Sequence, residues 1–252
     1  DLAAYTDATS SFVTEAGYSG RTDETMEWWA ASERRAALGA GAMTSLVFVP
    51  AMIHGFVGRH LDADAAQTEC ERALPHSVAV NASMRVFLLV EQNETGPPMD
   101  QAIETYLGVA PRLRDVIRSQ RIIYVNIALG RLAQCHAAGP DERALRLKQA
   151  EEAVAMLRRA AADKVQAART LAARADLLVL QGRHREAIEL LGRDTPFDRP
   201  DAPIATYEAA RVRARALRAL GSGPEALRHA RLAIQVAEEQ GWPHRVGWIT
   251  SE

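Results

Sequence analysis

The chain has 252 residues, a formal net charge of −2 and an isoelectric point near 6.4, a balance that argues against a general nucleic-acid or membrane surface. Hydrophobic residues make up 48% and charged residues 25%, as in globular proteins, whereas aromatic residues reach only 6%. This composition favours helices that pack through small residues. No stretch approaches the roughly 18 apolar residues of a membrane span. We therefore expect a cytoplasmic protein that binds neither nucleic acid nor membranes.

The two cysteines, Cys70 and Cys135, lie far apart and show no paired spacing. This predicts reduced thiols in a helical core and no disulfide framework. The sequence begins at Asp1 and ends at Glu252. We expect it to be a fragment of a longer polypeptide, itself without enzymatic activity, with any catalytic module outside it.

The first half of the chain is predicted to form helices at residues 2–16, from 22 to near 39, and at 43–57, 62–74, 77–92 and 100–119. Residues 93–98 form a loop rich in turn residues. Pro111 is expected to bend the helix at 100–119 or to divide it in two.

The second half shows stronger helical periodicity, at residues 121–138, 141–161, 167–181, 184–191, 207–220 and 224–239. A further short helix is expected to begin at residue 244. In the long helix at 141–161 the predicted buried stripe contains Leu145, Ala153, Val154 and Leu157.

About twelve helices joined by short turns correspond to six hairpins of roughly 35 to 45 residues, a period typical of helical solenoids. Strand signals are lacking. We predict an all-α fold in one continuous solenoid, with divergent helical repeats over residues 1–119 and clearer repeats over residues 120–252.

Small residues recur where the helices of a pair are expected to cross, with a glycine between them: Ala175, Gly182 and Ala187, then Ala214, Gly221 and Ala226. Gly130 and Ala133 fit the pattern less completely. The pattern resembles the tetratricopeptide repeat (TPR), and the resemblance covers residues 121–241 well. It implies a right-handed superhelix of antiparallel hairpins with a concave groove. Where the family usually has tryptophan and tyrosine, this chain has Leu171 and Leu178, or Ala210 and Leu217.

Residues 226–248, with Ala230-Arg231-Leu232-Ala233 and Gly241-Trp242-Pro243, are similar to the TPR tails of bacterial multidomain serine/threonine kinases and regulator ATPases. This narrower resemblance implies a sensor or scaffold portion of a bacterial signalling protein, one that binds a protein partner or a neighbouring domain.

A row of arginines is the best candidate site. Arg211, Arg215 and Arg218 are spaced i, i+4 and i+7, so they share one helix face. If Ala214 is the crossing residue, the resemblance places this row on the concave side. The same register places three residues of earlier helices in the groove: Arg131, Arg169 and Asp176. Guanidinium groups in a groove suit the capture of carboxylate or phosphate, so an acidic peptide or chain terminus is the expected ligand. The alternative is a solvated face, or arginines paired with Glu208 and nearby carboxylates.

The apolar segment at residues 46–57, with Trp28 and Trp29 nearby, is a second candidate. It could be a docking surface or a small-molecule pocket, which would make the chain a ligand-responsive regulatory domain. The alternative is the core of an N-terminal helical subdomain. Pro50 is expected to kink or to start this helix.

Other chemistry is not indicated. The seven histidines show no metal-type spacing. Cys135 and His136 point about 100° apart on a helix and cannot form a dyad. The glycine turns lack the lysine and the strand of a nucleotide site. We therefore expect no catalytic residues, no metal and no cofactor.

Overall fold

The computed structural model describes residues 15–36, 48–116, 118–192 and 201–252, and every regular element within these ranges is helical. The chain is all-α, as predicted. A short helical stretch at residues 15–19 precedes α2 (Thr22–Ala36), α3 (Val49–Phe56), α4 (His60–Ala73), α5 (Val78–Glu91) and α6 (Pro97–Val109). The 3₁₀ turns η2 (Leu113–Asp115) and η3 (Arg118–Ile122) lead into α7 (Ile123–Ala137), α8 (Pro140–Ala160), α9 (Lys164–Leu180), α10 (His184–Gly192), α11 (Pro203–Ala219), α12 (Gly223–Glu239) and α13 (Pro243–Thr250).

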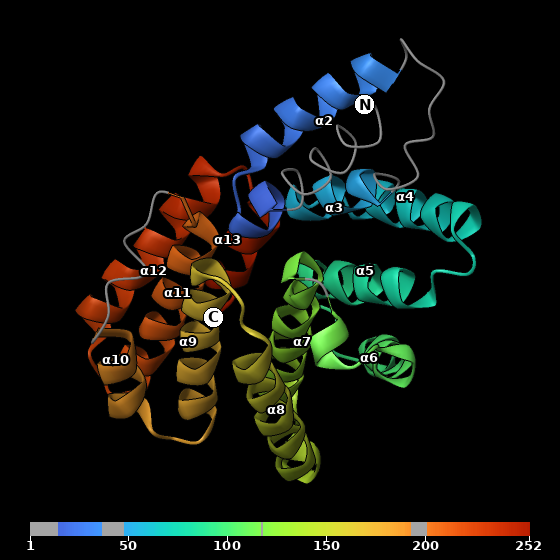
Figure 1. Cartoon of the computed structure of the whole chain (residues 1–252). Helices are drawn as coiled ribbons and strands as arrows, with labels where there is room; N and C mark the ends of the chain where they lie inside the picture. The colour runs from blue at the N-terminus through green and yellow to red at the C-terminus, as the bar shows by residue number, and fades with distance from the viewer. Residues whose placement is uncertain (1–14, 37–47, 117, 193–200) are drawn as a thin grey trace.

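The helices pack as successive hairpins. α3 packs on α4, α5 on α6, α7 on α8, α9 on α10 and α11 on α12. The first helix of each hairpin also contacts the first helix of the next, so that α3, α5, α7, α9 and α11 form a continuous row. Figure 1 shows these hairpins following one another around a curve. The last helix, α13, packs on α12 and lies toward the inside of that curve.

Several helices end in the same way, at a glycine with positive φ, among them those that end before Gly182 (+76°), Gly221 (+79°) and Gly241 (+68°). The amide of the residue after each glycine donates to a carbonyl five residues earlier, in the pairs Arg183–Leu178, Ser222–Leu217 and Trp242–Ala237. This is the Schellman geometry, which satisfies carbonyls at a helix end and favours glycine because it has no Cβ. The predicted helix stops at Gly182 and Gly221 are confirmed.

The small residues at the helix crossings are only partly those predicted. Ala175 and Ala187 are fully buried in one apolar cluster between α9, α10 and α11. On α11, Ala216 is one of several buried members of that cluster. Ala214 is half-buried and lies about 200° around α11 from Ala216, so it faces away from this cluster.

The long helix α8 is buried along its second half only. Ala153, Val154 and Leu157 are buried as predicted, but Leu145 is 58% exposed. At about 100° per residue, Leu145 lies roughly 180° around α8 from Val154 and roughly 120° from Leu157, so it is outside the buried face. The prediction for Leu145 is wrong.

The apolar segment around Pro50 is core where it is described. α3 has Pro50 in its first turn, as predicted, and its Val49, Met52 and Phe56 are buried. They pack with α4 and α5 side chains, and partly buried Trp28 and Trp29 pack against the same cluster. This supports the core interpretation over a docking surface for residues 48–57; residues 43–47 lie outside the described part.

Pro111 separates α6 from the 3₁₀ turn η2. The predicted alternative in which Pro111 divides the helix in two is therefore confirmed. α6 ends at Val109, and Ala110 has extended backbone, the conformation favoured before a proline. The chain continues as 3₁₀ turns instead of one helix. The predicted helix at residues 2–16 and the loop at 192–203 fall largely outside the described residues.

The start of α13 is joined to the end of α5 by a buried polar cluster that we call the clasp (Glu91, His244 and Arg245). The Arg245 Nη2 and Nε atoms lie 2.5 and 3.0 Å from the two oxygens of Glu91, and His244 Nε2 lies 2.9 Å from the same carboxylate. Nearby, the fully buried Trp242 donates its indole N–H to the Thr22 hydroxyl at 2.9 Å. These contacts fix the start of α13 against α5 and the N-terminal part.

Candidate functional site

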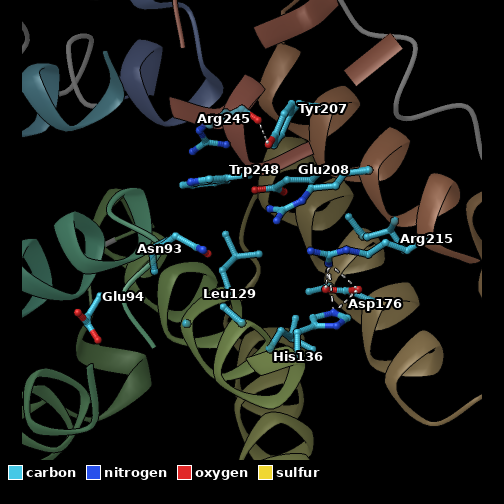
Figure 2. A pocket seen from close by; sticks show the side chains of 18 of the residues that line it. Asn93, Glu94, Leu129, His136, Asp176, Tyr207, Glu208, Arg215, Arg245 and Trp248 are labelled. Carbon is cyan, nitrogen blue, oxygen red and sulfur yellow. Dashed lines mark hydrogen bonds and ion pairs between the residues drawn. The ribbon is translucent and has the colours of Figure 1, made fainter. Parts of the chain in front are cut away.

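A groove of about 1000 Å³ opens between α7, α11, α12 and α13 on the inside of the curve. We define the groove by the side chains that can bind a ligand there: His136, Arg211, Arg215, Arg218, Trp248 and Glu252. A smaller pocket of about 70 Å³ adjoins it and is lined by several of the same residues together with Asp176. Figure 2 shows this smaller pocket, with Asp176 from α9 facing Arg215 from α11.

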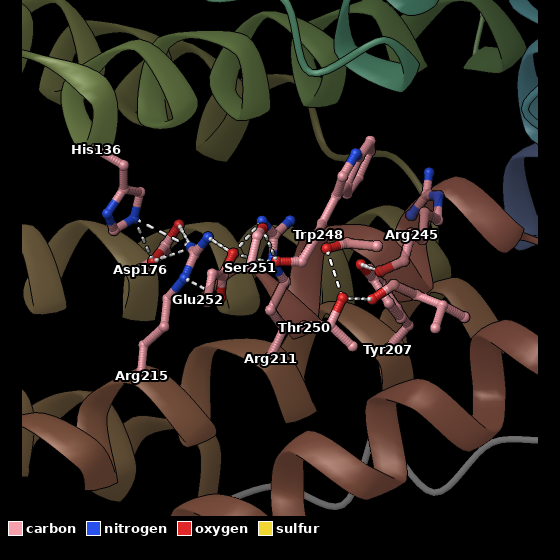
Figure 3. A network of polar contacts seen from close by, with 12 residues as sticks. His136, Asp176, Tyr207, Arg211, Arg215, Arg245, Trp248, Thr250, Ser251 and Glu252 are labelled. Atoms are coloured by element: carbon pink, nitrogen blue, oxygen red, sulfur yellow. Dashed lines mark hydrogen bonds and ion pairs between the residues drawn. The ribbon is translucent and has the colours of Figure 1, made fainter.

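Arg215 lies between two carboxylates. Its Nη1 contacts the Asp176 oxygens at 3.1 and 3.2 Å. Its Nε and Nη2 donate to the Glu252 carboxylate at 2.9 and 2.5 Å. The guanidinium therefore presents one edge to a buried acid of α9 and the other to an acid at the end of α13 (Figure 3).

Arg211 holds the same Glu252 carboxylate from the next helical turn. Its Nε donates at 2.8 Å, and its Nη2 makes a second, shorter contact. The guanidinium also lies 5.2 Å from the ring centroid of Trp248, within cation–π range. Two arginines thus bind a single carboxylate, and the Trp248 indole packs against one of these arginines.

Asp176 is buried, and its electrostatic environment keeps it ionised. Burial alone would raise the pKa of its carboxyl, but the charges of His136 and Arg215 and the hydrogen bond from His136 outweigh that effect. The pKa is held well below its ordinary value. The Glu252 pKa is also lowered, because Arg215 and Arg211 outweigh its desolvation.

His136 connects the two sides of the groove. Its Nε2 lies 3.0 Å from Asp176 Oδ1 and 3.1 Å from Arg215 Nη1. Arginine can only donate and an ionised carboxylate can only accept. An Nε2 that carries a proton therefore donates to Asp176, whereas a bare Nε2 accepts from Arg215.

Arg218 is the groove arginine without an acidic partner among the described residues. Its side chain is exposed and lines the groove one turn beyond Arg215. Within the described ranges it has no ion pair, and its guanidinium makes no hydrogen bond. Arg218 is therefore available to an anion without the loss of an internal contact.

The structure brings together four of the six predicted site residues, Asp176, Arg211, Arg215 and Arg218. Arg131 instead points toward α6, where it contacts Asp100 and donates to Gln134 at 2.8 Å. Arg169 is 3% exposed and forms a bidentate pair with Glu208, with a shortest distance of 2.7 Å. The expectation that Arg131 and Arg169 face the groove is wrong. The alternative, in which arginines pair with carboxylates of neighbouring helices, holds for Arg169 through Glu208. It also holds for Arg211 and Arg215, which are paired with Glu252, and Arg215 is paired with Asp176 as well.

One wall of the groove is apolar. Leu227 of α12 lines it and is 52% exposed. Small and branched side chains continue this wall beside the arginines: Val179, Ala219, Ala226, Ala230 and Ile249. A ligand that fills the groove therefore meets guanidinium groups on one side and apolar surface on the other.

Sequence reasoning missed His136, Trp248 and Glu252 as members of the site. A signal for α13 was present, because Arg245 and Trp248 are spaced i and i+3 and share one helical face. Nothing in the sequence indicated that this face would fold back onto α11. His136 had no signal, since its partners lie 40 and 79 residues away.

No family model, no curated protein and no solved structure matches this chain. Among the described residues no group of three or more His, Cys, Asp and Glu side chains could hold a metal ion. In the same part of the chain no helix is long and apolar enough to cross a membrane.

Proposed function

We propose that this chain is a protein-interaction module whose groove binds an acidic segment of a partner protein or of a neighbouring domain. The observation that carries the proposal is the capture of the Glu252 carboxylate by Arg211 and Arg215 at the edge of a large open groove. An internal carboxylate held in this way demonstrates the geometry that a partner's carboxylate requires.

The charges of the site favour an anion. Arg211, Arg215 and Arg218 contribute three positive charges, and Asp176 and Glu252 contribute two negative charges. The net charge of these five groups is therefore +1, whereas the whole chain has a formal net charge of −2. Because Leu227 and its neighbours form an apolar wall, the favoured ligand has apolar side chains beside its acidic ones.

The stacked hairpins supply the architecture for such a module. The glycine stops after α9, α11 and α12 and the alanines at the α9–α10 crossing support our proposal of a TPR-like superhelix. In that superhelix the row of first helices would form the concave face. The role that we propose for this chain is binding, as a scaffold or sensor of a bacterial signalling protein, rather than catalysis.

The test is a titration with a fluorescein-labelled, amidated hexapeptide of alternating glutamate and leucine, followed by fluorescence anisotropy. Arg218→Glu reverses the charge of the groove arginine that has no ion pair with a described residue, and it should weaken binding about fivefold, corresponding to roughly 1 kcal/mol. A peptide of alternating glutamate and serine carries the same charge and should bind more weakly, because it cannot use the apolar wall.

Arg228→Glu is the matched control. Arg228 is an exposed arginine of α12 that does not line the groove, so its reversal changes net charge by the same amount. Equal losses of affinity for the Arg218 and Arg228 variants would show non-specific attraction and would contradict the proposal. Binding should also weaken as salt rises, since part of each charge is exposed.

A further inference from the structure

The Glu252 carboxylate occupies the position that an acidic ligand would need. Of the groove arginines, Arg211 and Arg215 both donate hydrogen bonds to this carboxylate. A ligand carboxylate that enters the groove must therefore either use Arg218 alone or replace Glu252. We propose that Glu252 is an internal competitor, which the acidic group of the partner displaces; this inference rests on the proposed function.

The attachment of Glu252 suits displacement. α13 ends at Thr250, so Ser251 and Glu252 follow the helix and are not part of it. The Glu252 side chain is 27% exposed, and its carboxylate is held by the two arginines. Rotation of the Glu252 side chain releases the carboxylate to solvent without unpacking α13.

The rest of α13 stays in place during such an exchange. The clasp fixes its first turn, because Arg245 and Glu91 are each 3% exposed at their side chains and paired with each other. The Arg245 guanidinium also lies 5.0 Å from the Trp242 ring centroid and 5.4 Å from that of Trp248. Trp248 therefore remains in the groove wall while the residues after it move.

Release of Glu252 changes the charge of the groove. With Glu252 bound, the three arginines and two acids leave one positive charge; without it they leave two. Asp176 cannot take over as competitor, because it is buried and already paired with Arg215 on the other side of the guanidinium. The gain in positive charge is thus available to the ligand alone.

Glu252→Gln tests the inference, because glutamine keeps the shape of the side chain and removes its charge. In the anisotropy titration with the glutamate–leucine hexapeptide, this variant should bind about fivefold tighter than the unsubstituted chain, since the ligand no longer competes with a carboxylate. A substitution that removes a native contact would then raise affinity, which a purely structural role for Glu252 does not predict.

Glu238→Gln is the matched control, because Glu238 is an exposed acid of α12 outside the groove. It should change affinity by less than twofold. Equal gains for both variants would show a net-charge effect and would overturn the competitor role. Unchanged binding by Glu252→Gln, with Arg218→Glu still weaker, would overturn it and leave the proposed function standing. Absence of peptide binding by the unsubstituted chain and by Glu252→Gln would overturn both.

Discussion

The two ends of α13 each carry a contact between arginine and glutamate, with similar chemistry and different surroundings. At the start, Arg245 and Glu91 meet at 2.5 Å with side chains only 3% exposed. At the end, Arg215 and Glu252 also meet at 2.5 Å, but their side chains are 19% and 27% exposed. Buried ions cannot exchange their partner for water at low cost, whereas partly exposed ions can. The first pair therefore holds the fold, and the second is open to exchange.

The largest expected effect is at the clasp. Glu91→Ala leaves Arg245 buried without a counter-ion, which should lower the free energy of unfolding by about 3–5 kcal/mol. Urea unfolding followed by far-ultraviolet circular dichroism measures this loss. The double variant Glu91→Ala/Arg245→Met should recover part of it, because no isolated charge remains. A loss below 1 kcal/mol in the single variant would remove the distinction between the two ends of α13.

Asp176 gives an intermediate effect with a defined pH dependence. Asp176→Asn removes charge-assisted hydrogen bonds from Arg215 and His136 and should cost about 1.5–3 kcal/mol at neutral pH. The lowered pKa of Asp176 contributes stability that is present above the unfolded-state value of about 3.9 and is lost as pH falls through the folded-state pKa.

The unsubstituted chain should therefore lose more stability below pH 4 than Asp176→Asn does, and the difference between the two should narrow as pH falls. Thermal unfolding of both proteins at pH steps from 7 to 3 measures this difference in stability. Asp141→Asn, at an exposed acid of α8, is the control and should leave the difference from the unsubstituted chain small and constant. A constant difference for Asp176→Asn would contradict the buried ion pair.

The smallest expected effect is at the end of α13. Glu252→Gln should change the free energy of unfolding by less than about 1 kcal/mol, because water can replace the carboxylate on both arginines. Thermal unfolding at neutral pH measures this change beside the same variant's peptide affinity. A loss as large as that of Glu91→Ala would show that the last residues hold the fold, and the two ends of α13 would then be equivalent.

The helices themselves were largely predictable, because their signals are local. Pro50 at the start of α3, the break before Pro111 and the glycines after α9 and α11 act within one or two turns. Leu145 was mispredicted because it was assigned to the buried stripe of α8 although the 3.6-residue period places it on another face of the helix.

The sequence by itself determined that the chain is helical, where most helices stop, and that Arg211, Arg215 and Arg218 share one helical face, since each follows from the 3.6-residue period. Only the tertiary structure decided which arginines are available. Arg131 and Arg169 are paired with acids of neighbouring helices. Arg215 contacts three residues that are distant in the sequence, by 39, 79 and 37 residues respectively: Asp176, His136 and Glu252. Such pairings depend on how the hairpins stack and on where α13 folds back, and no local pattern encodes either.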